Sequence, residues 1–402
     1  MTDLSEFDRR GRSKQSHPKG WEAGVTYNPE KGGVINSGPL TDEPNEALWS
    51  ELIADFGLDP ATTEVVAGSI QVRAWDANIG GGETQRLRYY RATLKPRENN
   101  VVERDDLDAT IAEIKKHKPV KTVKNEGKVA FVVIGSDWQA GKAEGGGSKA
   151  IAERVLAGID NTVLRIKELQ KAGRPISSIY LVGLGDLVEQ CDGYYPMQTF
   201  GTDLDRRQQM KLVRQLLVYA VQELSKFGLP VILGAVPGNH GENRSNGKAF
   251  TTWTDNDDLA VFEQVAEIFS HNEERYGNVS VPSGAIAEDL TMTLDIEGVI
   301  VGFAHGHQFR SGANSQAKME TWWRGQVMGR QPIADAEILF AGHLHHFVIS
   351  ENTGRTVIQV PAMDGGSAWY TATSGSSSPA GMLTLTIGDG VGTRGWSDLL
   401  II

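Results

Sequence analysis

The chain has 402 residues, of which 40% are hydrophobic and 23% are charged, so it can form two globular domains with well-buried cores. Its net charge of −11 at pH 7 argues against a protein that coats nucleic acid through bulk charge, because such binding needs many Lys and Arg side chains to displace counterions. No apolar run has the length of a membrane span, the N-terminus lacks the apolar core of a signal peptide, and the single cysteine cannot form an internal disulfide, so we expect a cytoplasmic protein without membrane contact.

The first third of the chain predicts an arm and a small module. Residues 1–38 are polar and rich in glycine, without hydrophobic periodicity, which predicts a flexible arm. Residues 39–126 combine one amphipathic helical pattern, in "NEALWSELIADFG", with strand-like runs such as "RLRYYRATLK". They predict a small α+β module that ends in a lysine-rich linker. The linker is a candidate basic surface, although a solvated face or plain linker is the simpler explanation.

Residues 127–402 predict a larger α/β domain. From residue 127, apolar strand patterns alternate with long amphipathic helical patterns, and after residue 276 strands dominate. Such alternation indicates βαβ units, whose parallel strands place their carboxyl ends on one edge of a sheet. A four-layer α/β/β/α sandwich accommodates both halves of this region.

The stretch "VVIGSDWQAGKAEGGGS", residues 132–148, has the glycines and the lysine of a phosphate-binding loop but not their spacing. Five residues separate Gly135 from Gly141, and Lys142 is followed by Ala143, which has no hydroxyl to bind magnesium. We therefore exclude a nucleotide-binding P-loop. The residue left for chemistry at the end of this strand is Asp137.

Potential metal ligands follow several predicted strands of the large domain. Open α/β sheets bind ligands outside the carboxyl ends of their strands, so we expect these side chains to meet. Carboxylate, amide and imidazole groups in one place suit two neighbouring divalent metals that share a bridging carboxylate. The residues at these strand ends are Asp137, Gln139, Asp186, Asn239, His240, His305, His307, His343 and His345.

The blocks "SDWQ", "GD", "GNH", "HGH" and "GHLHH", spread over about residues 128–350, resemble the five signature blocks of the calcineurin-like metallophosphoesterases, and more loosely those of phage-encoded members. The resemblance implies an α/β/β/α sandwich, a binuclear metal centre, and hydrolysis of phosphoesters by a bridging hydroxide. It also implies that His240 is a catalytic histidine beside the substrate phosphate and not a ligand. The first metal would be held by Asp137, Asp186 and His345, and the second by Asp186, Asn239, His305 and His343.

One position departs from the family pattern. Gln139 stands where the family usually has a histidine, so the block reads Asp-x-Gln. A neutral amide oxygen is a harder and weaker ligand than imidazole, which favours Mn²⁺ or Mg²⁺ over Zn²⁺, with Fe²⁺ also compatible. Alternatively, Gln139 does not bind metal and a water takes its place. We expect two divalent ions, with Mn²⁺ preferred.

The substrate is predicted less directly. Basic residues between Arg310 and Arg330 flank Trp322 and Trp323, and cations combined with aromatic rings are typical of single-stranded nucleic-acid grooves, although one Trp could instead pack in the core. This favours a nuclease or nucleotide phosphodiesterase acting on DNA or RNA. A phosphomonoesterase and a non-catalytic nucleic-acid-binding protein are the alternatives. The candidate substrate-binding residues are Arg244, His307, Glu189 and Lys142.

Overall fold

The chain forms two compact units, Met1–Val101 and Val102–Ile402, in the computed structural model. The structure describes residues 21–28, 32–40, 46–66, 68–80, 83–96, 107–123, 127–194, 198–245, 247–309, 315–366 and 378–402. None of the helices within these ranges combines the length and the apolar character needed to cross a membrane.

The smaller unit is an antiparallel sheet covered by one helix. Its elements are β1 (Gly24–Asn28), β2 (Gly32–Asn36), α1 (Glu46–Asp55), β3 (Thr63–Val65), β4 (Gln71–Gly80) and β5 (Glu83–Pro96). The strand order is β1-β2-β5-β3, and β4 also pairs with β5. Alternate residues of β5, such as Tyr90 and Leu94, form a core with Trp49 and Ile53 of α1. This arrangement matches the predicted α+β character.

The bounds of this unit differ from the prediction at both ends. We expected a flexible arm over residues 1–38, but residues 24–36 form the β1–β2 hairpin, and residues 1–20 lie outside the described part of the chain. The hairpin is held in place because β2 pairs with β5 and buries Ile35 in the core of this unit. At the other end, the chain divides after Val101 and not after residue 126.

The region between residues 102 and 126 belongs to the larger unit because α2 (Leu107–Ile114) packs there. Ile114 is fully buried in the core that α5 (Asp257–Ser270) also lines. The Asn272 side-chain amide donates to the backbone oxygens of Ile114 and His117, at 2.7 and 3.1 Å. These contacts with distant residues are not visible in the local sequence pattern.

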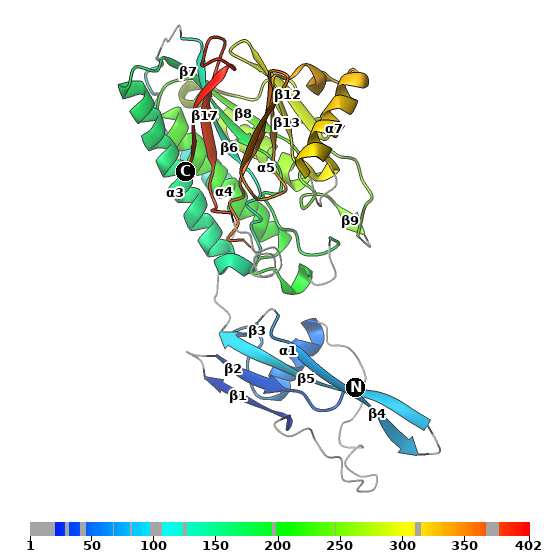
Figure 1. Cartoon of the computed structure of the whole chain (residues 1–402). Helices are drawn as coiled ribbons and strands as arrows, with labels where there is room; N and C mark the ends of the chain where they lie inside the picture. Colours follow the sequence, from blue (N-terminus) through cyan, green and yellow to red (C-terminus); the bar gives the residue numbers. More distant parts are fainter. Residues whose placement is uncertain are drawn as a thin grey trace. The chain divides into compact units, whose positions relative to one another are not determined.

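The larger unit is a sandwich of two sheets with helices on its outer faces, as Figure 1 shows. The first sheet has the order β11-β8-β7-β6-β17-β18, and the second has the order β12-β13-β14-β16-β15. Apolar side chains of both sheets, among them Ile134, Phe303 and Phe340, form one continuous core between them. The predicted α/β/β/α sandwich is therefore confirmed.

The strands of the first sheet are β6 (Val129–Gly135), β7 (Ile176–Gly183), β8 (Val231–Ala235), β11 (Val279–Ser280), β17 (Leu383–Ile387) and β18 (Trp396–Ile401). Those of the second are β12 (Thr291–Ile296), β13 (Val299–Ala304), β14 (Ile338–Ala341), β15 (Val348–Asn352) and β16 (Arg355–Gln359). The main covering helices are α3 (Gly147–Lys171), α4 (Arg206–Ser225), α5 and α7 (Ser315–Met328). Strands β6, β7 and β8 pair in parallel, as do β13, β14 and β16.

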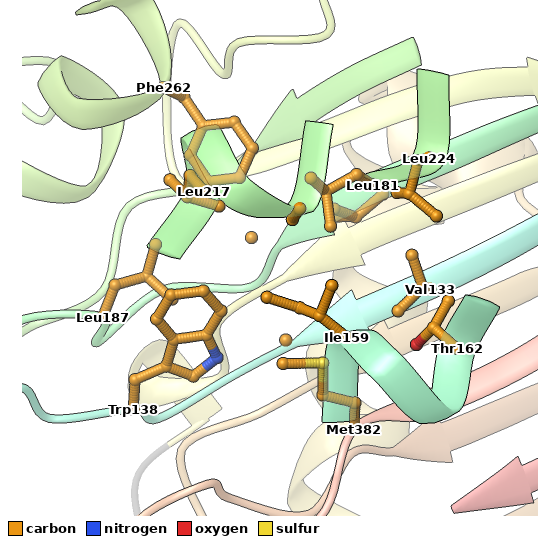
Figure 2. Close-up of a pocket in the computed structure, with 14 residues that line it drawn as sticks. Val133, Trp138, Ile159, Thr162, Leu181, Leu187, Leu217, Leu224, Phe262 and Met382 are labelled. Carbon is orange, nitrogen blue, oxygen red and sulfur yellow. The ribbon is translucent and has the colours of Figure 1, made fainter. Parts of the chain in front are cut away.

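The helices α3, α4 and α5 bury their apolar faces against the first sheet. Figure 2 shows this packing around Trp138, Ile159 and Phe262, where a cavity of about 10 Å³ remains. That volume is close to what a single water occupies, and the lining is almost entirely apolar, so we interpret it as a packing defect of the core.

Candidate metal centre

The predicted ligands are carried by loops that follow the carboxyl ends of parallel strands. Asp137 follows β6, Asp186 follows β7, and Asn239 follows β8 in the first sheet, while His305 and His343 follow β13 and β14 in the second. The loops of both sheets therefore meet at one end of the sandwich. This is the edge at which the parallel strand order predicts a site.

Backbone strain is concentrated in these loops. Five residues without glycine's freedom adopt a left-handed conformation there: Asp137 (φ 51°), Gln139 (φ 47°), Asp186 (φ 53°), His343 (φ 67°) and His345 (φ 59°). Such residues are uncommon, and they cluster at functional sites because the surrounding structure must hold them in place.

Glycines next to these loops allow a close approach of backbone to ligand residues. A Cβ atom on Gly238 would lie 2.1 Å from both the backbone nitrogen and Oδ1 of Asp186. The loops of β7 and β8 can therefore be this close only because residue 238 has no side chain.

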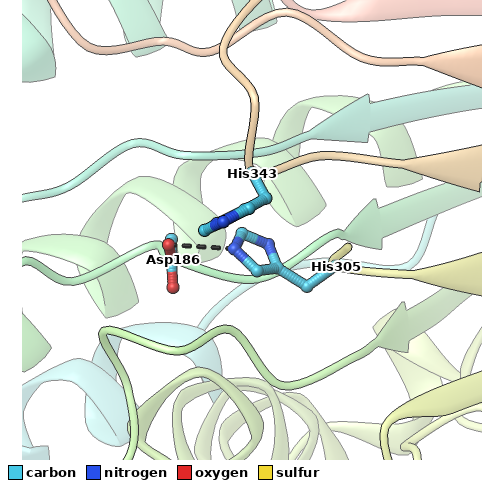
Figure 3. Close-up of side chains that lie close together, drawn as sticks. All are labelled: Asp186, His305 and His343. Carbon is cyan, nitrogen blue, oxygen red and sulfur yellow. Dashed lines mark ion pairs between the residues drawn. The ribbon is translucent and has the colours of Figure 1, made fainter. Parts of the chain in front are cut away.

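Three ligand residues converge in one cluster, as Figure 3 shows: Asp186, His305 and His343, each offering an atom within 4.8 Å of the others. The Nε2 atom of His305 lies 2.9 Å from Oδ2 of Asp186, because Nδ1 of the same ring is held 2.8 Å from the backbone oxygen of Leu184. A hydrogen bond at one ring nitrogen of a histidine orients the other nitrogen, here Nε2, toward a metal.

Asn239 completes the set. It is 1% exposed, and neither atom of its side-chain amide has a hydrogen-bond partner among the described residues. Buried polar groups are nearly always paired, so this amide is suited to an additional ligand. The neighbouring His240 N–H donates to Oδ1 of Asp186 at 2.7 Å, which keeps the Asn239 loop against the cluster. Asp186, Asn239, His305 and His343 therefore fit a divalent cation.

The pKa shifts of the cluster residues also fit a site for a divalent cation. Burial by itself raises the pKa of Asp186, but His305 and His240 outweigh it and hold that pKa well below its ordinary value. Burial lowers the pKa of His305, and the carboxylates of Asp186 and Asp137 reverse this and raise it to about 9. Burial and then His305 lower the pKa of His343 to about 4. His343 is thus neutral at pH 7, the form that binds metals.

His240 lies beside this cluster and is held by Glu189. Its Nδ1 atom is 3.1 Å from the backbone oxygen and 3.3 Å from a carboxylate oxygen of Glu189, and its ring is 4.5 Å from that of Tyr194. The other ring nitrogen, Nε2, lies 4.0 Å from Oδ2 of Asp186. The structure thus brings Glu189, a candidate substrate-binding residue, against the histidine.

The remaining predicted ligands form a second group around Lys142. The Nε2 atom of His345 lies 3.2 Å from Oδ1 of Asp137, and its Nδ1 atom lies 3.5 Å from Asp364. The ammonium group of Lys142 donates to Oε1 of Gln139 at 3.0 Å and also pairs with Asp364. The side-chain oxygen of Gln139 is thereby engaged by a cation and does not fit a metal ligand.

The other two candidate substrate-binding residues are held by Glu242. Arg244 donates to Glu242 at 2.6 Å and to the backbone oxygen of Gly247 at 3.1 Å, and its guanidinium lies 4.8 Å from the centre of the Tyr194 ring. His307 lies 3.8 Å from Glu242, and burial lowers its pKa to about 3. Both residues lie near the cluster, but Arg244 already has internal partners.

Sequence reasoning missed two acidic residues. Asp364 comes five residues after β16 ends, a strand-end position like those of the predicted ligands. Asp258 accepts hydrogen bonds from the backbone N–H groups of Asp186, Leu187 and Gly238, at 2.9, 2.8 and 2.9 Å. Burial, and then the nearby Asp186, raise its pKa to about 7. Its place in the first turn of α5 gave no sign of this role.

The tryptophan pair of α7 does not form a stacking surface. Trp323 is 6% exposed and donates to the backbone oxygen of Ile333 at 3.0 Å, so it belongs to the core under the second sheet. Trp322 packs its ring 4.6 Å from that of Phe309. The groove interpretation is therefore wrong for Trp323, and the alternative of a core tryptophan is confirmed. Arg310 lies outside the described residues.

The sandwich and the order of its ligand loops resemble the calcineurin-like metallophosphoesterases. No family model matches the chain, and no curated protein matches it. Among solved structures it is similar to Vps29 from Entamoeba histolytica, at 12% identity and a TM-score of 0.31, over 68% of this chain and 99% of that one.

Two further solved structures are similar at the same low level. One is a predicted phosphoesterase from Streptococcus pneumoniae TIGR4, at 11% identity and a TM-score of 0.26, over 65% of this chain and 84% of that one. The other is an archaeal phosphodiesterase, at 12% identity and a TM-score of 0.29, over 68% and 99%. At these scores we base no argument on them, and the looser resemblance to phage-encoded members stays a prediction.

Proposed function

We propose that the chain is a metal-dependent phosphoesterase that hydrolyses phosphodiesters. The observation that carries this is the convergence of Asp186, His305 and His343 within 4.8 Å. The backbone of His240 binds Asp186, and the preceding residue, Asn239, has a buried amide without a hydrogen-bond partner among the described residues. A divalent metal held by these residues would polarise a phosphoester oxygen and lower the pKa of a bound water. The carboxylate and amide oxygens suit Mn²⁺, whereas the imidazoles also suit Fe²⁺ and Zn²⁺, and we propose Mn²⁺ as the working metal.

His240 would act on the leaving group. The carbonyl oxygen of Glu189 lies 3.1 Å from Nδ1 and can accept only a hydrogen bond, so that contact leaves Nε2 as the ring nitrogen available to the substrate. That atom is 4.0 Å from Oδ2 of Asp186, near the cluster but outside ligand distance. A protonated Nε2 would donate to the leaving oxygen of the phosphoester.

Exposed aromatic side chains in the segment that follows His240 support a nucleic-acid substrate. The segment from Gly241 to Asp257 begins next to the histidine, and its two ends are joined by a hydrogen bond of 2.9 Å between Asp257 N and Gly241 O. Within it, Phe250 is 66% and Trp253 50% exposed. Exposed rings can stack on unpaired bases irrespective of sequence. We therefore propose a nuclease or nucleotide phosphodiesterase.

Hydrolysis assays on metal-stripped protein test the proposal, with Mn²⁺, Mg²⁺, Zn²⁺ or no metal added back. The substrates are bis-p-nitrophenyl phosphate, p-nitrophenyl phosphate, single-stranded DNA and double-stranded DNA. We expect diester and DNA cleavage that requires added metal and is lost in Asp186→Asn. Trp253→Ala should slow DNA cleavage more than cleavage of the small diester. Cleavage of the monoester alone would indicate a phosphatase, and inactivity with every metal would contradict the proposal.

A further inference from the structure

The position predicted for the first metal, at Asp137 and His345, differs from the position predicted for the second metal in how its side chains are used. An amide side chain binds a hard cation through its oxygen. The oxygen of Gln139 instead accepts a hydrogen bond from Lys142 at 3.0 Å, and its nitrogen lies 3.5 Å from Nε2 of His240. Gln139 is 5% exposed, and only its amide oxygen can accept a hydrogen bond from the ammonium group, so the Lys142 contact decides which end of the amide faces the lysine. The residue that replaces the family's histidine thus links Lys142 to His240.

Lys142 places a positive charge beside Gln139. Its side chain is only 14% exposed, and its ammonium group forms an ion pair with Asp364, whose side chain is 3% exposed. A metal bound to the Gln139 oxygen, with a metal–oxygen distance of about 2.1 Å, would lie within about 5 Å of this ammonium. Two positive charges at that distance in a buried site repel strongly. Lys142 therefore opposes a metal at Gln139.

We propose that this centre holds one divalent metal, at Asp186, Asn239, His305 and His343, and that the ammonium group of Lys142 takes the place of the other metal, the one expected at Asp137, Asp186 and His345. The proposal rests on the function proposed above. An ammonium group has three donors. Two of them are directed to Gln139 and Asp364, and the third can donate to a phosphate oxygen of the substrate. Lys142 would thus supply the second positive charge that a phosphodiester substrate requires.

The number of bound metals tests this proposal without any measurement of activity. Metal-free protein is titrated with Mn²⁺, and electron paramagnetic resonance reports the free ion, the bound equivalents, and any exchange coupling between two bound ions. We expect one uncoupled Mn²⁺ per chain in the native protein and in Gln139→His. The double variant Gln139→His/Lys142→Met should bind two, with a coupled spectrum. Asp186→Asn should lose the bound ion.

The outcomes separate this proposal from the proposed function. Two bound ions in the native protein, or in Gln139→His with Lys142 in place, would overturn the role of the lysine. A single ion in a double variant with native circular dichroism would also overturn it. No bound ion in the native protein, or an ion retained by Asp186→Asn, would overturn the metal site itself.

A kinetic comparison tests the lysine even if the double variant does not fold. Lys142→Met should lower kcat for diester hydrolysis with Mn²⁺ stoichiometry unchanged, and Lys142→Arg should recover part of the loss because it restores the charge. Equal activity in the native protein and Lys142→Met would contradict the contact with substrate.

Discussion

Replacement of Asp258 by alanine should destabilise the larger unit and weaken its metal site together. The carboxylate accepts hydrogen bonds from three backbone N–H groups in two loops, those of Asp186, Leu187 and Gly238, and it is 1% exposed. Alanine would remove both acceptor oxygens and leave three backbone donors without this partner. The loops that present Asp186 and Asn239 would then lose their common support.

The expected loss can be worked from these contacts. A hydrogen bond of this kind contributes about 1 to 1.5 kcal/mol net, so three give about 3 to 5 kcal/mol in the free energy of unfolding. Asp258→Asn is a sharper variant, because one oxygen, Oδ2, accepts from both Asp186 and Gly238. Asparagine can keep its oxygen at the position of Oδ2, but its NH₂ group then faces the Leu187 N–H, which is also a donor. We therefore expect the free energy of unfolding to fall by about 1 to 3 kcal/mol.

Urea unfolding of metal-free protein, followed by tryptophan fluorescence, measures these losses, and a Mn²⁺ titration measures the accompanying change in affinity. The exposed Asp255, three residues earlier in the chain, provides the matched control, since Asp255→Ala should change stability by less than about 0.5 kcal/mol. A loss below about 1 kcal/mol in Asp258→Ala, or unchanged Mn²⁺ affinity, would refute the reasoning that this carboxylate supports the ligand loops.

Three further predictions concern the same centre. His240→Ala should lower turnover by about 10² to 10⁴-fold with the metal content intact; loss of the metal would make the histidine a ligand instead. The carboxylate of Asp186 stabilises a proton on His305, whose pKa is about 9, and a bound metal must displace that proton. The apparent Mn²⁺ affinity should therefore rise with pH up to about pH 9. Mn²⁺ titrations that give the same affinity at every pH would contradict this. Gly238→Ala should abolish metal binding, because the added Cβ would lie 2.1 Å from atoms of Asp186. Gly325→Ala is the control and should bind metal normally, because no atom lies within 4 Å of its added Cβ. A Mn²⁺ titration of both variants measures the difference.

The sandwich and the principal ligand cluster could be predicted from the sequence for a physical reason. Buried parallel strands are continuous apolar runs, and their carboxyl ends share one edge of a sheet. The residues that follow those runs, Asp186, Asn239, His305 and His343, must therefore lie at one end of the domain. Local patterns also predicted α3 and α4, whose apolar faces repeat with helical periodicity.

Features that depend on contacts between distant residues could not be predicted in this way. The β1–β2 hairpin is held to the sheet because β2 pairs with β5. The sequence left open whether a tryptophan of the pair is buried, and packing under the second sheet decides this for Trp323. Asp258 lies 72 residues from the Asp186 backbone that it supports.

The use of the ligand groups was decided by tertiary structure alone. The sequence showed Gln139 in place of a histidine and left open whether it binds metal. Folding brings Lys142 against Asp364, 222 residues away in the chain, and the ammonium then engages the Gln139 oxygen. The sequence determined which chemical groups lie at this end of the sandwich, because they directly follow the apolar runs that form the parallel strands. Which of them face a metal and which face each other depends on side-chain packing and long-range ion pairs, which only the folded chain creates.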